Sequence, residues 1–357
     1  MTSDSSAQGM SRRQLLGVAA ATSAGLVVPT TASAGGGRPV AKPPAGMTRL
    51  SLPGKVVKIQ GSDTLQAGGL WPKQAAAKAM LHKAMIALTG KKDLGQAFAQ
   101  FVHKEDRVAI KPNGLGGGRG ATMASNKELV LEIVRGVMAA GVPAEQITIF
   151  EQYQSFLRGT RVLDEKLKLD AEFPQGVQTA IHDNRDATMD KITVSGVPTR
   201  FVRPFTEATA VINVPVIKDH SLCGYTGALK NITHGATTNP QSFHAHGCSP
   251  QIAELYAQDV VKSRMVLHVV DGFKALYDGG PKDRKSKCRV PHHAVYASTD
   301  PVALDYLGWQ VVDKLRKDNS LASLEAAGRK PTYIQVAADL GLGIADEARI
   351  ALTELLG

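Results

Sequence analysis

The stretch that decides the fold is residues 211–235, VINVPVIKDHSLCGYTGALKNITHG. Its start belongs to an apolar run, 210–217, which predicts a strand buried on both faces. The run ends abruptly in Lys218, Asp219 and His220, and a Gly-rich turn with further polar residues follows. Because ligands bind outside the carboxyl ends of strands in doubly wound sheets, a binding cleft is expected here.

Strands and helices alternate along the first half of the chain, with strands expected at 56–60, 107–111 and 146–150 and helices at 71–88, 93–101 and 126–140. Further strands are expected at 265–270 and 294–297, a hairpin within 191–203, and a helix from Asp300, with Pro301 in its first turn. This order predicts an α/β fold: a mostly parallel twisted sheet with helices on both faces, plus a small hairpin insertion.

Composition is typical of a globular protein, with 43% hydrophobic and 21% charged residues in a chain of 357. Residues 51–357 are expected to form a single α/β domain. The formal charge is +10, but aromatic residues make up only 5% and do not interleave with basic clusters such as 282–287. Nucleic acid is therefore not an expected partner. A solvated basic face is the simplest interpretation, and an anionic wall or membrane surface as neighbour is the alternative.

The first residues carry a targeting pattern. Residues 11–16, SRRQLL, place two arginines before an apolar segment at 15–28, and Ala32-Ser33-Ala34 fits a signal-peptidase site. Residues 1–34 are expected to be a twin-arginine signal peptide, and 35–50 a flexible lead-in rich in Gly, Pro and Ala. The twin-arginine translocation machinery would then export the chain to the periplasm or to the extracellular, cell-wall side. No other apolar stretch reaches the ~18 residues of a membrane span, so no stable transmembrane segment is expected after cleavage.

Polar residues occupy successive strand ends, and in a parallel sheet they would face one rim. Lysine can hold an anion or shuttle a proton where burial lowers its pKa, and an aspartate can orient an imidazole. The candidate catalytic residues are Lys218, His220, Lys230 and Asp271. The candidate binding residues are Lys111, Asn113, Asn231 and Asp300.

Histidine and cysteine gather between 220 and 248, which holds four of the ten histidines and two of the three cysteines. If 221–234 is partly helical, Cys223 and His234 lie on one stripe with His220 at its head. On an extended segment, His244 and His246 face the same way. His220, His244, His246 and Cys223 are therefore the candidate ligands of a transition metal. General acid–base chemistry or plain hydrogen bonding in a cleft is the alternative.

Other cofactors are not expected. The chain has no C-x-x-C, so no iron–sulfur cluster is predicted, and the disulfide pairing of its three cysteines stays open. The Gly-rich loop at 113–120 could bind an anionic group through its amides. It fits neither the dinucleotide fingerprint nor the P-loop, so NAD and ATP are not expected.

Several motifs occur in an order that resembles the family called domain of unknown function 362, from about 107 to about 312. They are KPN at 111–113, VPVIKDH at 214–220, TGALKN at 226–231, His246, DG at 271–272, GP at 280–281 and DPVALD at 300–305. Some members of that family carry ferredoxin-type segments, but this chain lacks the cysteines. The family is also distantly similar to the nickel-dependent lactate racemases, in which a Lys and several His serve a cofactor and proton transfer. That resemblance implies Lys218, His220, Lys230 and His246 as residues to test.

Two functions follow from these patterns. The first is an exported metal-dependent enzyme that acts on a small anionic molecule, such as a carboxylate, in a cleft of His, Lys and Asp side chains. The alternative is a non-catalytic exported protein that binds a metal or an anion. A wall-associated structural protein would rest on charge alone and would leave the clustered ligands unexplained. The substrate, the reaction and the oligomeric state stay open.

Overall fold

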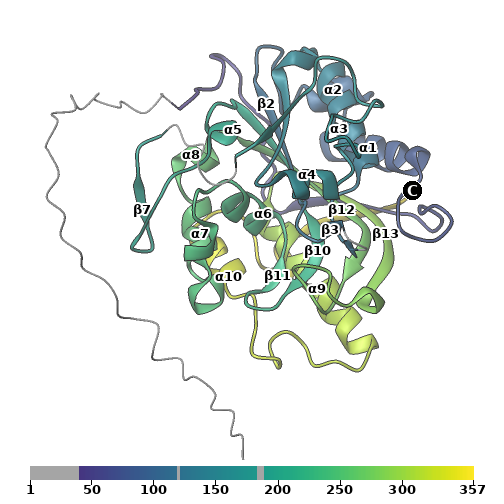
Figure 1. Ribbon diagram of the computed structural model, residues 1–357, viewed down its shortest axis with the longest axis vertical. Helices are drawn as coiled ribbons and strands as arrows, with labels where there is room; N and C mark the ends of the chain where they lie inside the picture. Colours follow the sequence, from purple (N-terminus) through teal and green to yellow (C-terminus); the bar gives the residue numbers. More distant parts are fainter. Residues whose placement is uncertain (1–39, 119–120, 183–188) are drawn as a thin grey trace, which may run out of the picture. The chain divides into compact units, whose positions relative to one another are not determined.

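The computed structural model describes residues 40–118, 121–182 and 189–357, within one compact unit, Gly37–Gly357 (Figure 1). The expected signal peptide, 1–34, lies outside the described residues, as does the start of the lead-in, 35–39. The described part of the lead-in packs on the body: the Ala41 amide donates to the Thr206 carbonyl at 2.9 Å, and Arg49 pairs with Asp106 at 2.8 Å. This segment is therefore attached to the domain and differs from the free linker that its composition suggests.

A mixed, mostly parallel sheet forms the centre of the unit, which confirms the predicted α/β class. Its strand order is β14-β1-β13-β12-β9-β2-β5-β6. The bounds are β1 (Lys55–Gln60), β2 (Val108–Pro112), β5 (Ile147–Glu151), β6 (Gln178–Ile181), β9 (Ala210–Val214), β12 (Met265–Leu276), β13 (Arg289–Ser298) and β14 (Ala351–Leu356). Strands β12, β9, β2, β5 and β6 run parallel, whereas β13 runs antiparallel to both of its neighbours.

Helices cover both faces of the sheet, as predicted (Figure 1). Alternate residues of one strand enter different cores: Ala109 packs on one side of β2, and Val108 and Ile110 pack on the other. One face carries α1 (Gln74–Thr89), α2 (Leu94–Phe98) and α3 (Lys127–Ala139). The other carries α6 (Ala228–Gly235), α7 (Gln251–Tyr256), α9 (Pro301–Asp318) and α10 (Tyr333–Asp339).

Short elements complete the fold. The predicted hairpin is present as β7 (Ile192–Val194) and β8 (Val197–Thr199). The other small elements are β3 (Gly117–Gly118), β4 (Ala121–Thr122), α4 (Gln154–Gly159), α5 (Arg203–Thr206), α8 (Asp259–Lys262) and the 3-10 turns η1 (Ala144–Gln146), η2 (Pro240–Phe243), η3 (Ala245–Cys248), η4 (Ser286–Cys288) and η5 (Glu347–Arg349). Among the described residues, no helix combines the length and the apolarity that a membrane span requires.

The apolar run at 210–217 is two strands, where one was predicted. Pro215 has no amide proton to donate, and the chain changes partners at this residue. Before it, β9 pairs with β2 and the start of β12; after it, β10 (Val216–His220) pairs with the second half of β12 and with β11 (Gly224–Thr226). The long strand β12 spans both parts. The break carries the end of β10 to the cavity described next.

Candidate functional site

A cavity of about 500 Å³ lies at the carboxyl ends of β2 and β5, and β10 and α6 line it as well. Such a volume suits a small ligand. Six of the predicted site residues line it: Lys111, Asn113, His220, Lys230, Asn231 and His244. Five do not: Lys218, Cys223, His246, Asp271 and Asp300. The strand-end argument therefore located the cavity but not every residue around it.

The turn after β10 positions α6, although 221–234 was expected to be partly helical from its start. Gly224 has φ +76°, and a Cβ there would lie 1.9 Å from the Arg329 carbonyl oxygen, so only glycine fits this turn. Residues 224–226 form β11, and the helix begins only at Ala228. The buried Asp305 carboxyl group accepts from the Ala228 amide and from the Leu229 amide, at 3.1 Å for the latter. These bonds satisfy two amides at the amino end of α6 and so fix its start.

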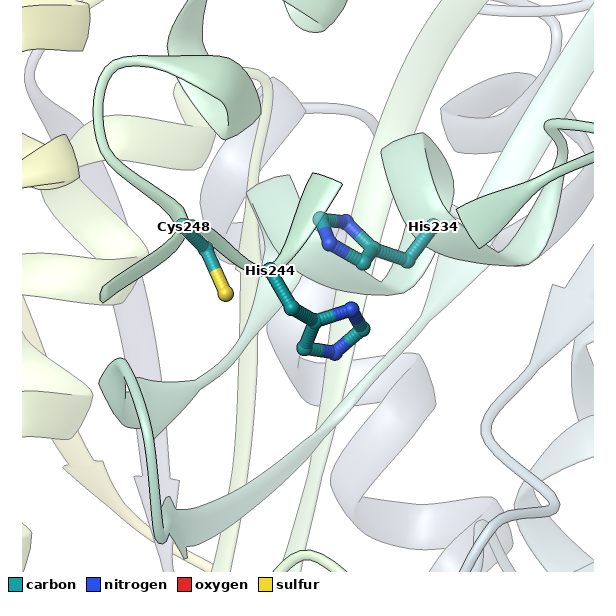
Figure 2. Close-up of side chains that lie close together, drawn as sticks. All are labelled: His234, His244 and Cys248. Atoms are coloured by element: carbon teal, nitrogen blue, oxygen red, sulfur yellow. The ribbon is translucent and has the colours of Figure 1, made fainter. Parts of the chain in front are cut away.

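A candidate metal site lies against the cavity. The candidate ligand atoms of His234, His244 and Cys248 all lie within 4.8 Å of one another (Figure 2). His234 comes from α6, His244 from the junction of η2 and η3, and Cys248 from the end of η3. Two imidazoles and a thiolate form a donor set that suits zinc and other transition ions. Metal–ligand bonds of about 2.0–2.3 Å place neighbouring donors about 3.5 Å apart, so closure by about 1 Å would complete the set.

Hydrogen bonds to backbone carbonyls orient both imidazole rings. The Nδ1 atom of His244 lies 3.0 Å from the Pro240 carbonyl, and Nε2 of His234 lies 3.1 Å from the Phe243 carbonyl. A ring N–H that donates to a backbone carbonyl is the usual support of a metal-binding histidine. It leaves the Nε2 lone pair of His244 and the Nδ1 lone pair of His234 as acceptors. The Lys230 ammonium lies 3.2 Å from the first of these atoms and the Thr233 hydroxyl 3.2 Å from the second, and a bound metal would replace both contacts. Burial lowers the pKa of His244 to about 4 and that of His234 well below its usual range, so both rings are neutral at pH 7.

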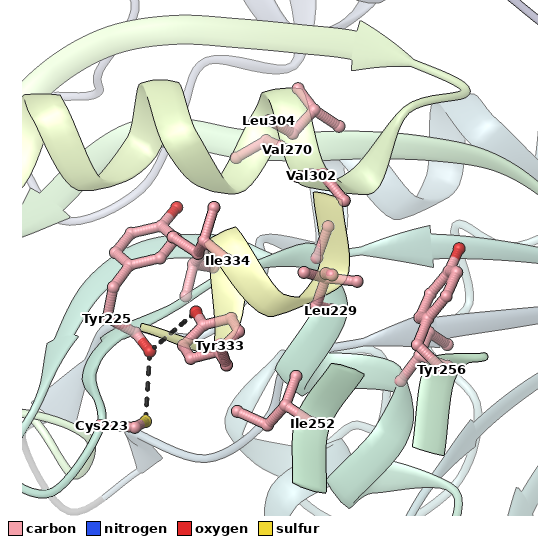
Figure 3. Close-up of a cluster of buried hydrophobic side chains, with 14 of the residues drawn as sticks. Cys223, Tyr225, Leu229, Ile252, Tyr256, Val270, Val302, Leu304, Tyr333 and Ile334 are labelled. Atoms are coloured by element: carbon pink, nitrogen blue, oxygen red, sulfur yellow. Dashed lines mark hydrogen bonds between the residues drawn. The ribbon is translucent and has the colours of Figure 1, made fainter. Parts of the chain in front are cut away.

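The surroundings of Cys248 favour the thiolate. A hydrogen bond from the Cys223 thiol is the largest of the effects that lower its pKa to about 7, and the nearby Lys230 ammonium also lowers it. Burial raises the pKa of Cys223 well above its usual range, so Cys223 stays a thiol, and its sulfur also lies 3.3 Å from the Tyr225 carbonyl oxygen (Figure 3). Cys223, a predicted ligand, therefore lies beside the cluster as a protonated neighbour of Cys248 and donates to the Tyr225 carbonyl.

Lys230 joins the cluster to the cavity. Its Nζ lies 3.2 Å from Nε2 of His244 and 3.8 Å from the sulfur of Cys248, and the side chain is only 5% exposed. No carboxylate pairs with it among the described residues. A buried ammonium without a carboxylate partner is costly, and an anion in the cavity would compensate its charge.

His220 was predicted as a metal ligand, but it lies outside the cluster, with its ring 5.8 Å from that of His244. Its Nδ1 accepts from the Leu222 amide at 3.1 Å and from the Cys223 amide at 3.4 Å. Burial and the nearby Lys230 lower its pKa to about 2, so the ring is neutral and its proton is on Nε2. His220 therefore offers the cavity a hydrogen-bond donor.

Lys111 forms a buried ion pair at the end of β2. Its Nζ lies 2.8 Å from Oε1 of Glu151, which also accepts from the Gly114 amide at 2.7 Å. Gly235 makes room for this lysine, because a Cβ there would lie 2.6 Å from Lys111 Cε. The amide of Gly114, which begins the Gly-rich loop, is thus used to hold Glu151.

A continuous chain of buried hydrogen bonds runs from Lys218 behind the cavity wall. The ammonium donates to Asn113 Oδ1 at 2.7 Å, Asn113 Nδ2 to Asn231 Oδ1 at 3.0 Å, and Asn231 Nδ2 to Asn213 Oδ1 at 2.7 Å. Asn213 Nδ2 then donates to His268 Nδ1 at 3.0 Å. Because an ammonium can only donate, each amide orientation in the chain is set by the one before it. Burial lowers the pKa of Lys218 to about 7.

Three other residues that were predicted to belong to the site lie outside the cavity. Asp271 lies inside β12 and accepts from the Asn126 amide at 2.6 Å, so it caps α3 and orients no imidazole. Asp300 was expected on the same rim, which is wrong: β13 is antiparallel, so its end lies at the opposite edge, where Asp300 caps α9 and accepts from Gly54. His246 is exposed, and its φ of +48° turns it out of the extended geometry that would align it with His244.

Glu151, His234 and Cys248 were missed as site residues. Glu151 could have been found, because it ends β5 just as Lys111 comes near the end of β2. His234 stands four residues after Lys230 on α6, the spacing that places two side chains on one helix face. Cys248 had no comparable signal, since its position depends on a turn with φ +63°.

The chain is similar to one protein family and to several solved structures. The family model for the domain of unknown function 362 matches residues 108–310. No curated protein sequence matches the chain. Similar solved structures include a Thermotoga maritima protein from the Northeast Structural Genomics Consortium (8% identity, TM-score 0.42, covering 73% of this chain and 60% of that one). They also include the lactate racemase apoprotein of Thermoanaerobacterium thermosaccharolyticum (14%, 0.37, 72% and 57%). The chain thus spans about three fifths of each structure. By the family match, which covers more than half of its length, the chain belongs to the domain of unknown function 362 family.

Proposed function

We propose that the chain is a metal-dependent enzyme that acts on a small anionic molecule. The observation that carries this proposal is the convergence of His234, His244 and Cys248 beside a cavity that also receives the buried ammonium of Lys230. A structural metal site alone would not require an uncompensated cation next to it.

Each residue of the site would have a separate role. When bound, a divalent transition ion would supply Lewis acidity toward an oxygen of the substrate. His234, His244 and Cys248 would hold it. Lys230 would bind the anionic group and compensate its charge, and His220 would donate a hydrogen bond from Nε2 to a substrate oxygen.

Cobalt(II) titration tests the metal site, because thiolate ligation gives a charge-transfer absorption band. We expect about one equivalent to bind with this band in the wild-type protein, a loss of the band in Cys248→Ser, and at least tenfold weaker binding in His234→Ala. His246→Ala is the matched control, since this exposed histidine of the same segment should leave the titration unchanged. Equal cobalt spectra in wild type and Cys248→Ser would refute the site.

Turnover is tested with the metal-loaded protein on a panel of small carboxylates and phosphate esters. Activity that disappears in Cys248→Ser supports the enzyme. A protein that binds metal through the cluster but turns over nothing in the panel would instead support the non-catalytic binder.

We also propose that the chain works outside the cytoplasm, which is supported by the paired Arg12 and Arg13 ahead of an apolar segment. Cell fractionation should find wild-type protein in the exported fraction and an Arg12→Lys/Arg13→Lys variant retained in the cytoplasm. Equal distribution of the two would contradict this proposal.

A further inference from the structure

The charges around the cavity do not balance. Four cations line it, Lys111, Lys230, Lys282 and Arg284, against one carboxylate, Glu151. Glu151 is already paired with Lys111 at 2.8 Å. Across the described ranges, none of the other three cations forms an ion pair, so the cavity carries three uncompensated positive charges. A ligand with a single negative charge would leave most of this charge unmatched.

The three cations lie at two different depths. Lys230 is buried on α6, in contact with the metal cluster. Lys282 and Arg284 are exposed on the loop that joins β12 to β13, at the mouth of the cavity. A ligand that reaches both must therefore extend from the cluster to the mouth. Apolar side chains, including Leu115 and Phe156, also line the cavity and can cover methylene groups.

The loop holds its two cations in a defined place. The residue between them, Asp283, points inward: it is 7% exposed, accepts from the Thr122 amide at 2.8 Å and pairs with Arg289. The Gly280 amide donates to Asp219 at 2.6 Å, which ties the start of the loop to β10. The anchor fixes the backbone on either side of Asp283, so Lys282 and Arg284 start from a defined position at the mouth of the cavity.

We propose that the substrate is a linear dianion, with an inner anionic group bound by Lys230 and an outer one bound by Lys282 and Arg284. This inference rests on the proposed function, because it names the substrate class of the same site. Guanidinium and ammonium groups accept either a carboxylate or a phosphoryl group as the outer anion.

Isothermal titration calorimetry with matched probes tests the proposal. Succinate, glutarate and adipate are compared with butyrate, pentanoate and hexanoate, which have the same chain lengths and one charge fewer. 3-Phosphonopropionate tests a phosphoryl outer group. We expect the best dianion to bind the wild type at least tenfold more tightly than its matched monoanion. A preference below about threefold for every dianion would overturn the proposal.

Variants test which residues cause the preference for dianions over monoanions. In Lys282→Ala/Arg284→Ala the ratio of dianion affinity to monoanion affinity should fall to about twofold or less, with little change in the monoanion affinity itself. The control, Lys285→Ala/Lys287→Ala, removes the same charge from the same loop at residues that do not line the cavity, and should keep the ratio. Lys230→Met should weaken dianions and monoanions alike, by about tenfold. An unchanged ratio in Lys282→Ala/Arg284→Ala would refute the outer site.

Cobalt titration of the same samples separates this inference from the proposed function. An intact charge-transfer band with no dianion preference would overturn the substrate class and leave the metal site standing. Absence of the band in wild type would refute the metal site, and the dianion ratio would still decide the inference.

Discussion

Replacement of Asn231 by alanine should destabilise the protein strongly, because this amide is the central link of the buried chain from Lys218 to His268. Asn231 accepts from Asn113 at 3.0 Å and donates to Asn213 at 2.7 Å, and these two partners are 5% and 0% exposed. Removing the amide leaves Asn113 Nδ2 and Asn213 Oδ1 buried without these partners, and it also removes the donor that lies 3.2 Å from the Lys111 carbonyl oxygen.

The magnitude follows from these two groups. A buried polar atom left without its partner costs about 1–3 kcal/mol, so the pair gives about 2–6 kcal/mol. Asn113 lines the cavity, where water can replace part of its lost bond, whereas Asn213 is sealed. We therefore expect about 2–4 kcal/mol, a large part of the typical stability of about 5–15 kcal/mol. Asn231→Asp should cost at least as much, because its second oxygen would face Asn213 Oδ1.

Denaturant unfolding provides the assay, with the midpoint shifted and the slope unchanged. Asn319→Ala is the control: this exposed amide donates to Leu315 near the end of α9, and its loss should stay within about 0.5 kcal/mol. A loss below about 1 kcal/mol in Asn231→Ala would show that the chain of amides does not act as a connected unit.

Three other predictions concern the same region. Burial raises the pKa of Asp305 to about 8, so between about pH 4 and 8 the folded protein holds a proton that the unfolded chain releases. The free energy of unfolding should therefore fall as pH rises through this window, by up to about 1.4 kcal/mol per pH unit. Denaturant unfolding at pH 5 and pH 7.5 should show this slope in the wild type and not in Asp305→Asn. Lys230→Met removes a cation that competes for two of the cluster's ligand atoms, so cobalt should bind about tenfold more tightly; weaker binding would argue against the shared position. Gly224→Ala should lower the free energy of unfolding by about 2–5 kcal/mol, because strain at positive φ adds to a clash with the Arg329 carbonyl. Gly196→Ala is the control: Gly196 has a similar φ but open space around it, so this variant should lose only about 1–2 kcal/mol in the same denaturation assay.

Much of the fold could be predicted because apolar periodicity reports burial directly. The buried strands and the helix that ends at Gly90 follow from local residue order. The direction of β13 was missed, although a clue was present: the segment between Leu276 and Arg289 has no long helical pattern, and a parallel return needs a crossover that is usually a helix. A basic loop of this length without a helix favours an antiparallel pair.

The candidate site could be predicted only in part, because strand ends can be read from sequence and turn geometry cannot. Lys111, Asn113 and His220 come at or just after buried strands and reached the cavity as expected. The exchange of His246 for His234 in the ligand set comes from positive φ values at His246 and Cys248, which fold the segment back on α6. Non-glycine residues adopt that conformation only under tertiary constraint, so no local pattern announces it.

The pairing of β1 with β14 sets an order on biosynthesis. These neighbours are register-matched from Lys55 with Ala351 to Gln60 with Leu356, so β1 is joined to a segment that is made much later in synthesis. Until residues 351–356 have left the ribosome, β1 has only β13 as a possible neighbour and presents unpaired backbone groups on its other side, the kind of edge that recruits other chains. A chaperone that shields β1 during synthesis would therefore be of most use to this protein, and a chain stopped short of Ala351 should be prone to aggregate even with its cavity residues already made.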